Sequence, residues 1–177
     1  MMLCEKTPID GALVIGFDRM EDDRGFFGRI FCREALSACG AAMEVAQANI
    51  SGNLLAGTLR GLHYQAAPHA EDKLVRVVAG AAFDVAVDLR EGSPTYGKWH
   101  GVTLSRDNFR AFFIPKGCAH GYYTTEDGTE LVYFASSPYA PLAERGVAWD
   151  DPRLAIAWPG EPKVMSAKDR ALKPHAW

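Results

Sequence analysis

The chain has 177 residues, of which 48% are hydrophobic and 23% charged, and its formal net charge is -3. This composition excludes a mainly disordered chain, and the length favours one domain over residues 1–177 with a well-buried core. The small negative charge excludes a broad basic surface, so we expect neither a nucleic acid nor a membrane as a partner.

The N-terminus and the cysteines lead to two further expectations. The first eight residues lack an apolar stretch of signal-peptide length, and no run of about 18 apolar residues occurs, so we expect a soluble, cytoplasmic protein. The cysteines form no Cys-x-x-Cys pair and no zinc-ligand spacing. We therefore expect four reduced, partly buried thiols, at Cys4, Cys32, Cys39 and Cys118.

Short apolar segments alternate with turn-forming residues along the chain. They predict strands near residues 12–16, 44–50, 57–65, 73–79, 82–90, 99–104, 110–114, 120–124 and 130–136. Only residues 33–38 and about 166–172 are predicted as helix, and Ser166 is placed to cap the second one. Regular short strands with frequent turns are typical of a sandwich or jelly roll, so the predicted fold class is mainly β.

The clearest strand pattern covers residues 82 to 90. Apolar residues there alternate with Asp84, Ala86, Asp88 and Arg90 at the two-residue period of a strand. A strand with acids on one face needs water or a polar cavity on that side. We therefore expect Asp84 and Asp88 to face one or the other.

Two histidines lie beside glycines in strand-like segments. His63 belongs to residues 57–65, Gly-Thr-Leu-Arg-Gly-Leu-His-Tyr-Gln, and His120 completes the spacing Pro115-x-Gly117-x-x-His120, which is typical of a cupin. A metal-binding cupin usually shows His-x-His at the first site, whereas this chain has Gln65 two positions after His63. The sequence thus predicts a cupin-type pocket with an incomplete metal cage.

An ordered set of motifs resembles the dTDP-4-dehydrorhamnose 3,5-epimerase family, also called dTDP-4-keto-6-deoxyglucose 3,5-epimerases, which are metal-independent cupins. The matching pieces are residues 23–27, Gln47-x-Asn49-x-Ser51, residues 60–65, 73–76, 84–90, 93–97 and 114–121, Tyr133, Tyr139, residues 149–152, and Ser166-x-Lys168-Asp169. The resemblance implies a cupin jelly roll (double-stranded β-helix) with short flanking helices, and neither a metal nor a cofactor.

The resemblance also implies a reaction. The family's enzymes invert C3 and C5 of a nucleotide-linked 4-keto-6-deoxy sugar, so the expected substrate is dTDP-4-dehydro-6-deoxyglucose and the expected setting is deoxysugar biosynthesis. The ketone makes the neighbouring carbons weakly acidic. A base on one face, an acid on the other and a cation beside the enolate oxygen can then move the protons.

Four residues match the family's catalytic positions. His63 is the expected base, because histidine with its unperturbed pKa of about 6.5 is mostly neutral yet still basic in the cytoplasm. Asp169 matches the carboxylate that orients the base, Tyr133 the acid, and Lys73 the cation that holds the enolate oxygen. From pattern alone, Tyr133 in its apolar run would be a core tyrosine, and Lys73 beside Glu71 and Asp72 a solvated lysine.

Eight further residues match substrate-binding positions of the family. Two guanidinium groups are expected at the pyrophosphate, where each can contact two oxygens, and two aromatic rings are expected to stack on the base or sugar. The set is Arg24, Arg60, Gln47, Asn49, Asp84, His120, Phe27 and Tyr139, with a hydrogen bond expected between His120 and Asp84. His120 alone would equally suit a buried structural histidine.

The resemblance further implies a homodimer in which an N-terminal strand joins the neighbour's sheet and Phe27 reaches the partner's nucleotide site. The apolar stretch from Ala12 to Ile15 is compatible with such an exchange. Two departures from the family pattern concern the substrate: Arg29 stands where the family often has an acid, and residues 66–72 differ from the usual linker before the lysine.

Several alternatives stay open. The chain is either a 3,5-epimerase, a 3-epimerase only, or an epimerase of a GDP- or CDP-linked 4-keto sugar. A metal-dependent cupin isomerase or dioxygenase would use His63 and His120, although Gln65 and Thr124 stand where further ligands are expected. A sugar or nucleotide binding module without catalysis is the third reading, and the four catalytic candidates in family order speak against it.

Overall fold

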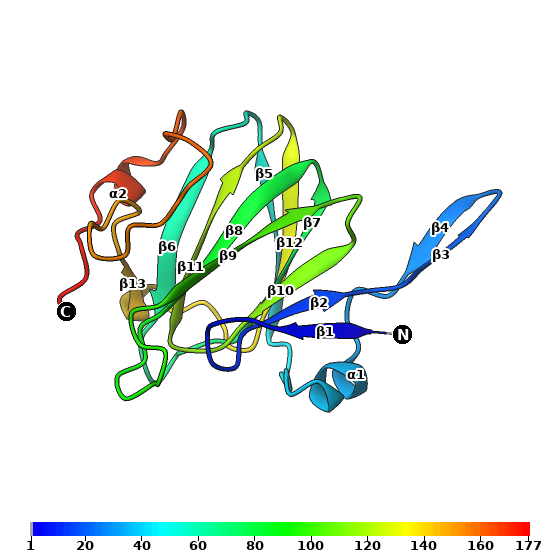
Figure 1. Cartoon of the computed structure of the whole chain (residues 1–177), viewed down its shortest axis with the longest axis horizontal. Coiled ribbons are helices and arrows are strands. Elements are labelled where there is room, and N and C mark those ends of the chain that lie inside the picture. The colour runs from blue at the N-terminus through cyan, green and yellow to red at the C-terminus, as the bar shows by residue number, and fades with distance from the viewer. Residues whose placement is uncertain (1) are drawn as a thin grey trace.

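The structure, a computed structural model, describes residues 2–177, whose strands form two main sheets (Figure 1). The first sheet has the order β1 (Leu3–Lys6), β2 (Leu13–Gly16), β10 (Arg110–Ile114), β7 (Lys73–Ala79), β12 (Thr129–Ala135), β5 (Gln47–Asn53). The second has the order β13 (Glu144–Gly146), β6 (Leu59–Gln65), β11 (Cys118–Thr124), β8 (Ala81–Asp88), β9 (Trp99–Ser105). Neighbours in each sheet pair antiparallel, and the predicted mainly β, jelly-roll fold class is confirmed.

A two-stranded hairpin, β3 (Arg19–Asp22) with β4 (Gly25–Gly28), projects from the body of the molecule (Figure 1). The helices are short: α1 (Arg33–Ala38), the 3-10 turn η1 (Pro141–Ala143) and α2 (Ala167–Arg170). Helix α1 has the predicted bounds. Helix α2 is shorter than predicted, and Ser166 caps it as predicted, because its Oγ accepts the N–H of Asp169 at 3.0 Å.

The nine predicted strands are all present with small shifts at their ends. Strands β1, β3, β4 and β13 were not predicted, because each has only three or four residues and lacks a period-2 alternation of apolar side chains. The main core lies between the sheets and consists of fully buried side chains from both, among them Val75, Val77, Phe112 and Leu131 from the first and Ala82, Ala86 and Leu104 from the second.

The expectation that the acids of the 82–90 strand face water or a cavity is wrong. Asp84 and Asp88 in β8 are both fully buried, because each is satisfied by side chains of its own chain. Asp88 accepts hydrogen bonds from Arg90, Ser93 and Thr95. Burial alone would raise the pKa of Asp88, but these hydrogen bonds outweigh it and hold the pKa far below the usual range.

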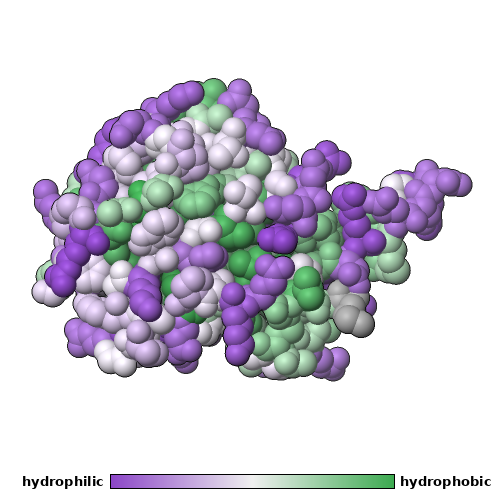
Figure 2. All heavy atoms as spheres, in the orientation of Figure 1, coloured by the Kyte–Doolittle hydropathy of each residue, from purple (hydrophilic) through white to green (hydrophobic). Residues whose placement is uncertain are grey.

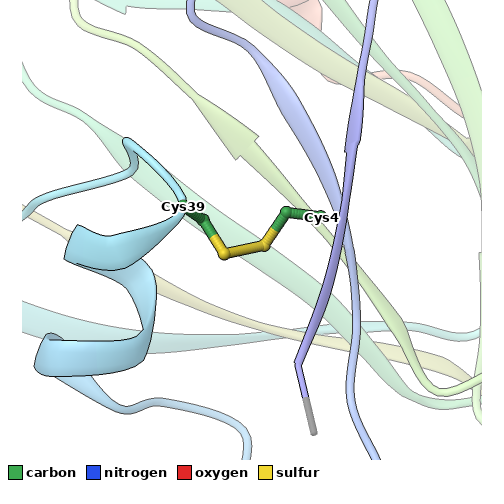
Figure 3. Close-up of a disulfide and its surroundings, with 2 residues drawn as sticks. All are labelled: Cys4 and Cys39. Atoms are coloured by element: carbon green, nitrogen blue, oxygen red, sulfur yellow. A yellow bond between two sulfur atoms is a disulfide. The ribbon is translucent and has the colours of Figure 1, made fainter.

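The expectation of four reduced cysteines is also wrong for one pair. Cys4 in β1 and Cys39 at the C-terminal end of α1 form a disulfide across a sequence separation of 35 residues (Figure 3). Helix α1 and strand β1 pack against one apolar cluster, which brings the Cα atoms of Cys4 and Cys39 to 6.2 Å from each other. The spacing of the cysteines in the sequence does not reveal this proximity. Cys32 and Cys118 are free, and burial raises the pKa of the Cys118 thiol to about 12.

The stretch from Ala12 to Ile15 is not the segment that leaves the molecule. These residues are buried, and β2 pairs with β1 and β10 of its own chain. The part of the N-terminal region that extends away is the hairpin of β3 and β4, whose apolar side chains Met20, Phe26 and Phe27 are exposed. Within residues 2–177, no helix has the length and hydropathy needed to span a membrane.

Candidate active site

A cavity of about 550 Å³ opens between the two sheets, with α2 at its mouth. Strands β5, β6, β7, β11 and β12 all contribute to its wall. Eight of the twelve predicted site residues line it: His63, Asp169, Tyr133, Lys73, Gln47, Arg60, His120 and Tyr139. The structure thus brings together residues that the chain separates by more than a hundred positions.

His63 and Asp169 form a pair at the cavity wall. The Nε2 atom of His63 lies 2.8 Å from Oδ1 of Asp169, and Oδ2 of the same carboxylate accepts the N–H of Gly61 at 3.4 Å. Burial acts to raise the pKa of Asp169, but the hydrogen bond and charge of His63 and the backbone N–H outweigh it and lower the pKa. The carboxylate is therefore ionised at neutral pH and fixes the orientation of the imidazole ring. Because Nε2 faces Asp169, Nδ1 is the ring nitrogen that the carboxylate does not engage.

The C-terminal segment reaches β6 through backbone contacts. The carbonyl of Val164 accepts the N–H of Leu59 at 2.9 Å, and Val164 bridges to Thr58, so the chain enters α2 alongside β6. On the other side of β6, Gly61 has φ +127°, and a Cβ there would lie 2.5 Å from the Cα of Gly121. Only glycine allows β6 and β11 this close approach, which sets His63 opposite His120.

His120 has its own carboxylate. Its Nε2 lies 3.0 and 3.1 Å from the two oxygens of Asp84, so the predicted hydrogen bond is confirmed. Asp84 is 0% exposed and does not line the cavity, so it acts there through His120 and not by contact. Within residues 2–177, no group of three or more His, Cys, Asp or Glu side chains is arranged to hold a metal ion.

The facing wall belongs to the first sheet and carries Lys73 and Tyr133. Lys73 is buried, and its Nζ forms an ion pair with Oε1 of Glu71 at 3.3 Å. Burial raises the pKa of Tyr133, and the charges of Glu71 and Tyr122 raise it further, against a smaller opposing effect of Arg60. The phenol is therefore neutral at physiological pH and can donate a proton.

Arg60 is held at the cavity by strand β5. Its Nε donates to Oδ1 of Asn53 at 2.9 Å and its Nη2 to the carbonyl of Gly52 at 3.1 Å. Asn53 is fixed in turn, because its Nδ2 donates to the carbonyl of Thr129 and its Oδ1 also accepts the hydroxyl of Tyr122. The guanidinium therefore has a set orientation and retains N–H groups for an anion.

Gln47 and Asn49 share the cavity-facing side of the edge strand β5. Gln47 accepts the backbone N–H of Tyr139 at 2.9 Å, and its Nε2 lies 3.4 Å from Oδ1 of Asn49. Asn49 does not itself line the cavity. Asn49 lies opposite Tyr133 in the strand register, and its buried Nδ2 has no hydrogen-bond partner among residues 2–177.

Arg24 and Phe27 lie outside this cavity. Both are on the β3–β4 hairpin, where Arg24 is paired with Asp22 at 2.6 Å and Phe27 is 63% exposed. Phe27 instead lines a smaller apolar hollow of about 360 Å³ together with Phe17 and Met20. Figure 2 shows how far the hairpin stands from the rest of the surface.

Several cavity residues were missed by sequence reasoning. Tyr139 donates to Glu144, whose other oxygen lies 2.5 Å from Nζ of Lys168. Burial acts to raise the pKa of Glu144, but Lys168 and Tyr139 outweigh it and lower the pKa. Lys168 belongs to the same motif as Asp169, so the sequence could have identified it as a cavity residue, whereas no sequence pattern marks Glu144. Glu71 lies two residues before Lys73, and the two-residue period of a strand would have placed both side chains on the same face.

The arrangement suits proton transfer at a carbon beside a carbonyl. A carboxylate-oriented imidazole lies on the wall of the second sheet, while a neutral phenol and an ammonium lie on the wall of the first. A flat substrate between the walls would meet a base on one face and an acid on the other.

Comparison with known proteins leads to one family. The sequence profile described as dTDP-4-dehydrorhamnose 3,5-epimerase matches residues 6–176. The dTDP-4-dehydrorhamnose 3,5-epimerase of Shigella flexneri is 44% identical over 165 residues, which span 93% of this chain and 91% of that protein.

Solved structures agree with the sequence comparison. The dTDP-4-dehydrorhamnose 3,5-epimerase of Bacillus anthracis, with TDP and PPi bound, matches with a TM-score of 0.96 and 39% identity, covering 99% of this chain and 100% of that one. The dTDP-6-deoxy-D-glucose-3,5-epimerase of Legionella pneumophila, in complex with dTDP-4-keto-L-rhamnose, matches with a TM-score of 0.93 and 43% identity, covering 98% and 93%.

Proposed function

We propose a specific reaction for this chain, which belongs to the dTDP-4-dehydrorhamnose 3,5-epimerase family. Acting as one domain over residues 1–177, it inverts C3 and C5 of dTDP-4-dehydro-6-deoxyglucose in deoxysugar biosynthesis. The single observation that carries the proposal is the His63–Asp169 pair at 2.8 Å, facing Lys73 and Tyr133 across one cavity.

In the proposed mechanism, His63 takes the proton from a carbon beside the ketone. The C–H electron pair moves into the new C=C bond while the ketone oxygen becomes an enolate oxygen, which the Lys73 ammonium stabilises. Asp169 stabilises the imidazolium that forms. Tyr133 then delivers a proton to the opposite face of the same carbon, which inverts its configuration, and solvent restores both groups.

Substrate binding is proposed for the remaining predicted residues. Arg60, held by Asn53, contacts the pyrophosphate, and the unpaired amide of Asn49 and the side chain of Gln47 contact the sugar or nucleotide. His120, oriented by Asp84, contacts the sugar. Tyr139 flanks the ligand at the mouth, where it is 56% exposed.

We propose that the reaction uses neither a metal nor a cofactor. Both histidines already direct Nε2 at a carboxylate, and Gln65, in the second-ligand position of a metal cupin, is tied to the backbone of His69, Pro138 and Ala140. Elemental analysis checks this directly. Stoichiometric iron or manganese that survives chelation and is needed for turnover would favour the metal-dependent isomerase or dioxygenase.

Isotope exchange tests the reaction. Incubation with dTDP-4-keto-6-deoxyglucose in deuterated water should place deuterium at both carbons beside the ketone, and His63→Ala is the matched negative control. Exchange at C3 alone would make the protein a 3-epimerase. GDP- and CDP-linked analogues run in parallel test whether Arg29 changes the nucleotide preference, and no exchange with any of them would refute the proposal.

We propose that the enzyme is a homodimer in which the β3–β4 hairpin of each chain completes the partner's site. The support is that Arg24 and Phe27 stand outside their own cavity on an exposed hairpin with an apolar side. Sedimentation gives the mass, which should be twice that of the 19.3 kDa chain.

A mixed dimer tests the exchange of hairpins. At substrate concentrations well below KM, chains carrying His63→Ala and chains carrying Phe27→Ala are each weakly active alone, but one site of their mixed dimer has an intact base and an intact hairpin. Random re-association should therefore restore about a quarter of wild-type activity, since half the dimers are mixed and half their sites are intact. No restoration would show that each hairpin serves its own chain.

We also propose a cytoplasmic location. The support is chemical, because a nucleoside diphosphate sugar carries charges that cannot cross a bilayer unaided. A reducing cytoplasm would open the Cys4–Cys39 disulfide of the structure to two thiols. Alkylation of intact cells before lysis should then label both, and an unlabelled, disulfide-bonded pair would point to an oxidising compartment.

A further inference from the structure

Glu71 is an ionisable side chain of the cavity that has no part in the proposed chemistry. Glu71 lines the cavity just before β7, its side chain is only 11% exposed, and its Oε1 lies 3.3 Å from Nζ of Lys73. Burying a carboxylate beside a site where an enolate must form is unfavourable unless the carboxylate is paired. The position of the Glu71 carboxylate in the cavity therefore calls for a structural explanation, and its pairing with Lys73 is the contact to consider.

Glu71 reaches the cavity from the position just before β7. Lys73 and Val75 share one face of that strand, because side chains two residues apart do so, and Glu71, two residues before Lys73, lines the cavity with them. In the β7–β12 register, Val75 lies opposite Tyr133 and Lys73 opposite Ala135. Lys73 and Tyr133 are thus diagonal neighbours on one face, about 7 Å apart by sheet geometry, with Glu71 next in the row.

We propose that Glu71 is a positioning residue of this active site: its carboxylate holds the Lys73 ammonium on the cavity wall and places a negative charge in the same cavity as Tyr133. The inference rests on the proposed roles of Lys73 and Tyr133. A long, flexible lysine side chain needs such an anchor to present its ammonium at one point. The same negative charge opposes loss of the proton that Tyr133 must deliver.

The other groups around Tyr133 leave Glu71 as the main source of negative charge there. Strand β5 contributes no titratable side chain between Gln47 and Asn53. Burial contributes most to the raised pKa of Tyr133, Glu71 is next, Tyr122 adds to it, and Arg60 opposes it. The other charged and titratable groups at this cavity are Lys73 at β7, Tyr122 and His120 on β11, Arg60, His63 and Tyr64 on β6, Asp84 behind His120 on β8, Tyr139 before η1, Glu144 on β13, and Lys168 and Asp169 on α2.

The sign of the expected effect follows from the charge. Ionised Tyr133 is a phenolate, so a nearby carboxylate disfavours it and keeps the proton on to higher pH. In Glu71→Gln the charge is lost while an amide oxygen remains to accept from Lys73. The pH at which activity falls on the alkaline side should therefore move down, and turnover at neutral pH should change by less than about threefold.

A second variant removes the anchor as well as the charge. In Glu71→Ala nothing at position 71 accepts from Nζ of Lys73, so kcat should fall about tenfold with little change in KM, because the cation acts on the enolate and not on the bound ketone. Glu130→Gln is the matched control. It removes the same charge from the same strand as Tyr133, but from an exposed side chain, and it should leave the pH profile in place.

The experiment records pH profiles of kcat and of deuterium exchange for the wild type, Glu71→Gln, Glu71→Ala and Glu130→Gln. Ultraviolet difference titration of each protein against its Tyr133→Phe version reports the phenolate without substrate. Phenolate formation at lower pH in Glu71→Gln than in the wild type is expected, and superimposable titrations would overturn the inference.

The failure of this inference and the failure of the proposed function are distinguishable. A wild-type protein that exchanges no deuterium with any nucleotide sugar refutes the function, whatever the titration gives. An active wild type whose alkaline limb and Tyr133 titration are unchanged by Glu71→Gln refutes the role of Glu71 alone. Circular dichroism of each variant confirms that it is folded when it is compared.

Discussion

The cavity and the β3–β4 hairpin differ in where their side chains find partners. In the cavity, His63 pairs with Asp169, His120 with Asp84 and Lys73 with Glu71, all within one chain. On the hairpin, which stands out from the body of the molecule (Figures 1 and 2), Phe26 and Phe27 are exposed, and Arg24 pairs with its neighbour Asp22. A lone two-stranded hairpin is marginally stable in water. The paired side chains of the cavity thus lie within one chain, whereas the hairpin presents side chains that do not reach the cavity of their own chain, as the proposed homodimer requires.

The largest effect should come from breaking the His63–Asp169 pair. His63→Ala removes the proposed general base, so kcat should fall about 10³-fold while substrate affinity changes little. Asp169→Asn keeps the shape but not the charge and should also lower kcat by at least about 10²-fold. Steady-state kinetics together with a substrate-binding titration measure the two parts. A loss confined to KM would mean that the pair binds substrate and does not transfer protons.

Tyr133→Phe sharpens the comparison inside the cavity. Without the acid, His63 can still form the enolate, so deuterium should enter at one carbon while inversion slows by about 10²-fold. Mass spectrometry of the recovered sugar and chromatography of the product separate exchange from inversion. A variant that forms product at the wild-type rate would leave Tyr133 as a packing residue only.

Phe27→Ala tests the hairpin side. Loss of one stacked ring should raise KM by about tenfold with kcat nearly unchanged, because stacking between a base and an aromatic side chain contributes about 1 to 3 kcal/mol. Phe26→Ala on the same strand is the control, since that ring packs edge-on against Phe109 of its own chain at 5.6 Å. Equal effects from both substitutions would indicate a general loss of hairpin structure.

Asn53→Ala should have a smaller effect on binding. It removes the acceptor of Arg60 Nε while leaving the guanidinium itself in place, so KM should rise roughly fivefold. Inhibition by inorganic pyrophosphate separates an effect on the position of Arg60 from an effect on stability. The inhibition constant for pyrophosphate should rise in parallel with KM. Unchanged pyrophosphate inhibition would show that Arg60 does not need this anchor.

The smallest effect on turnover is expected at the disulfide. Cys4→Ser removes a crosslink that closes a loop of 35 residues, which contributes about 4 kcal/mol of stability by loop entropy. Thermal unfolding should shift to lower temperature in Cys4→Ser, and in the wild type under reductant, while kcat stays within about twofold. Cys32→Ser serves as the control, and equal melting temperatures for all forms would show that the crosslink does not form.

Local sequence patterns predicted much of the fold. The alternation of Phe83, Val85 and Val87 predicted β8, and Ser166 predicted the cap of α2, because period and capping depend on neighbours in the chain. The burial of Asp84 and Asp88 was not predictable in this way. Their partners His120, Arg90, Ser93 and Thr95 cover a face that alternation alone assigns to a polar environment.

By itself, the sequence determined the mainly β class, most strand positions and the ordered motif set that identified the family. Only the tertiary structure decided which carboxylate each histidine meets, that Cys4 lies beside Cys39, that Glu71 joins the cavity, and that Ala12 to Ile15 stay in their own sheet. The reason is physical. Periodicity fixes the face on which a side chain lies, whereas a contact across tens of residues depends on how separate strands pair and pack.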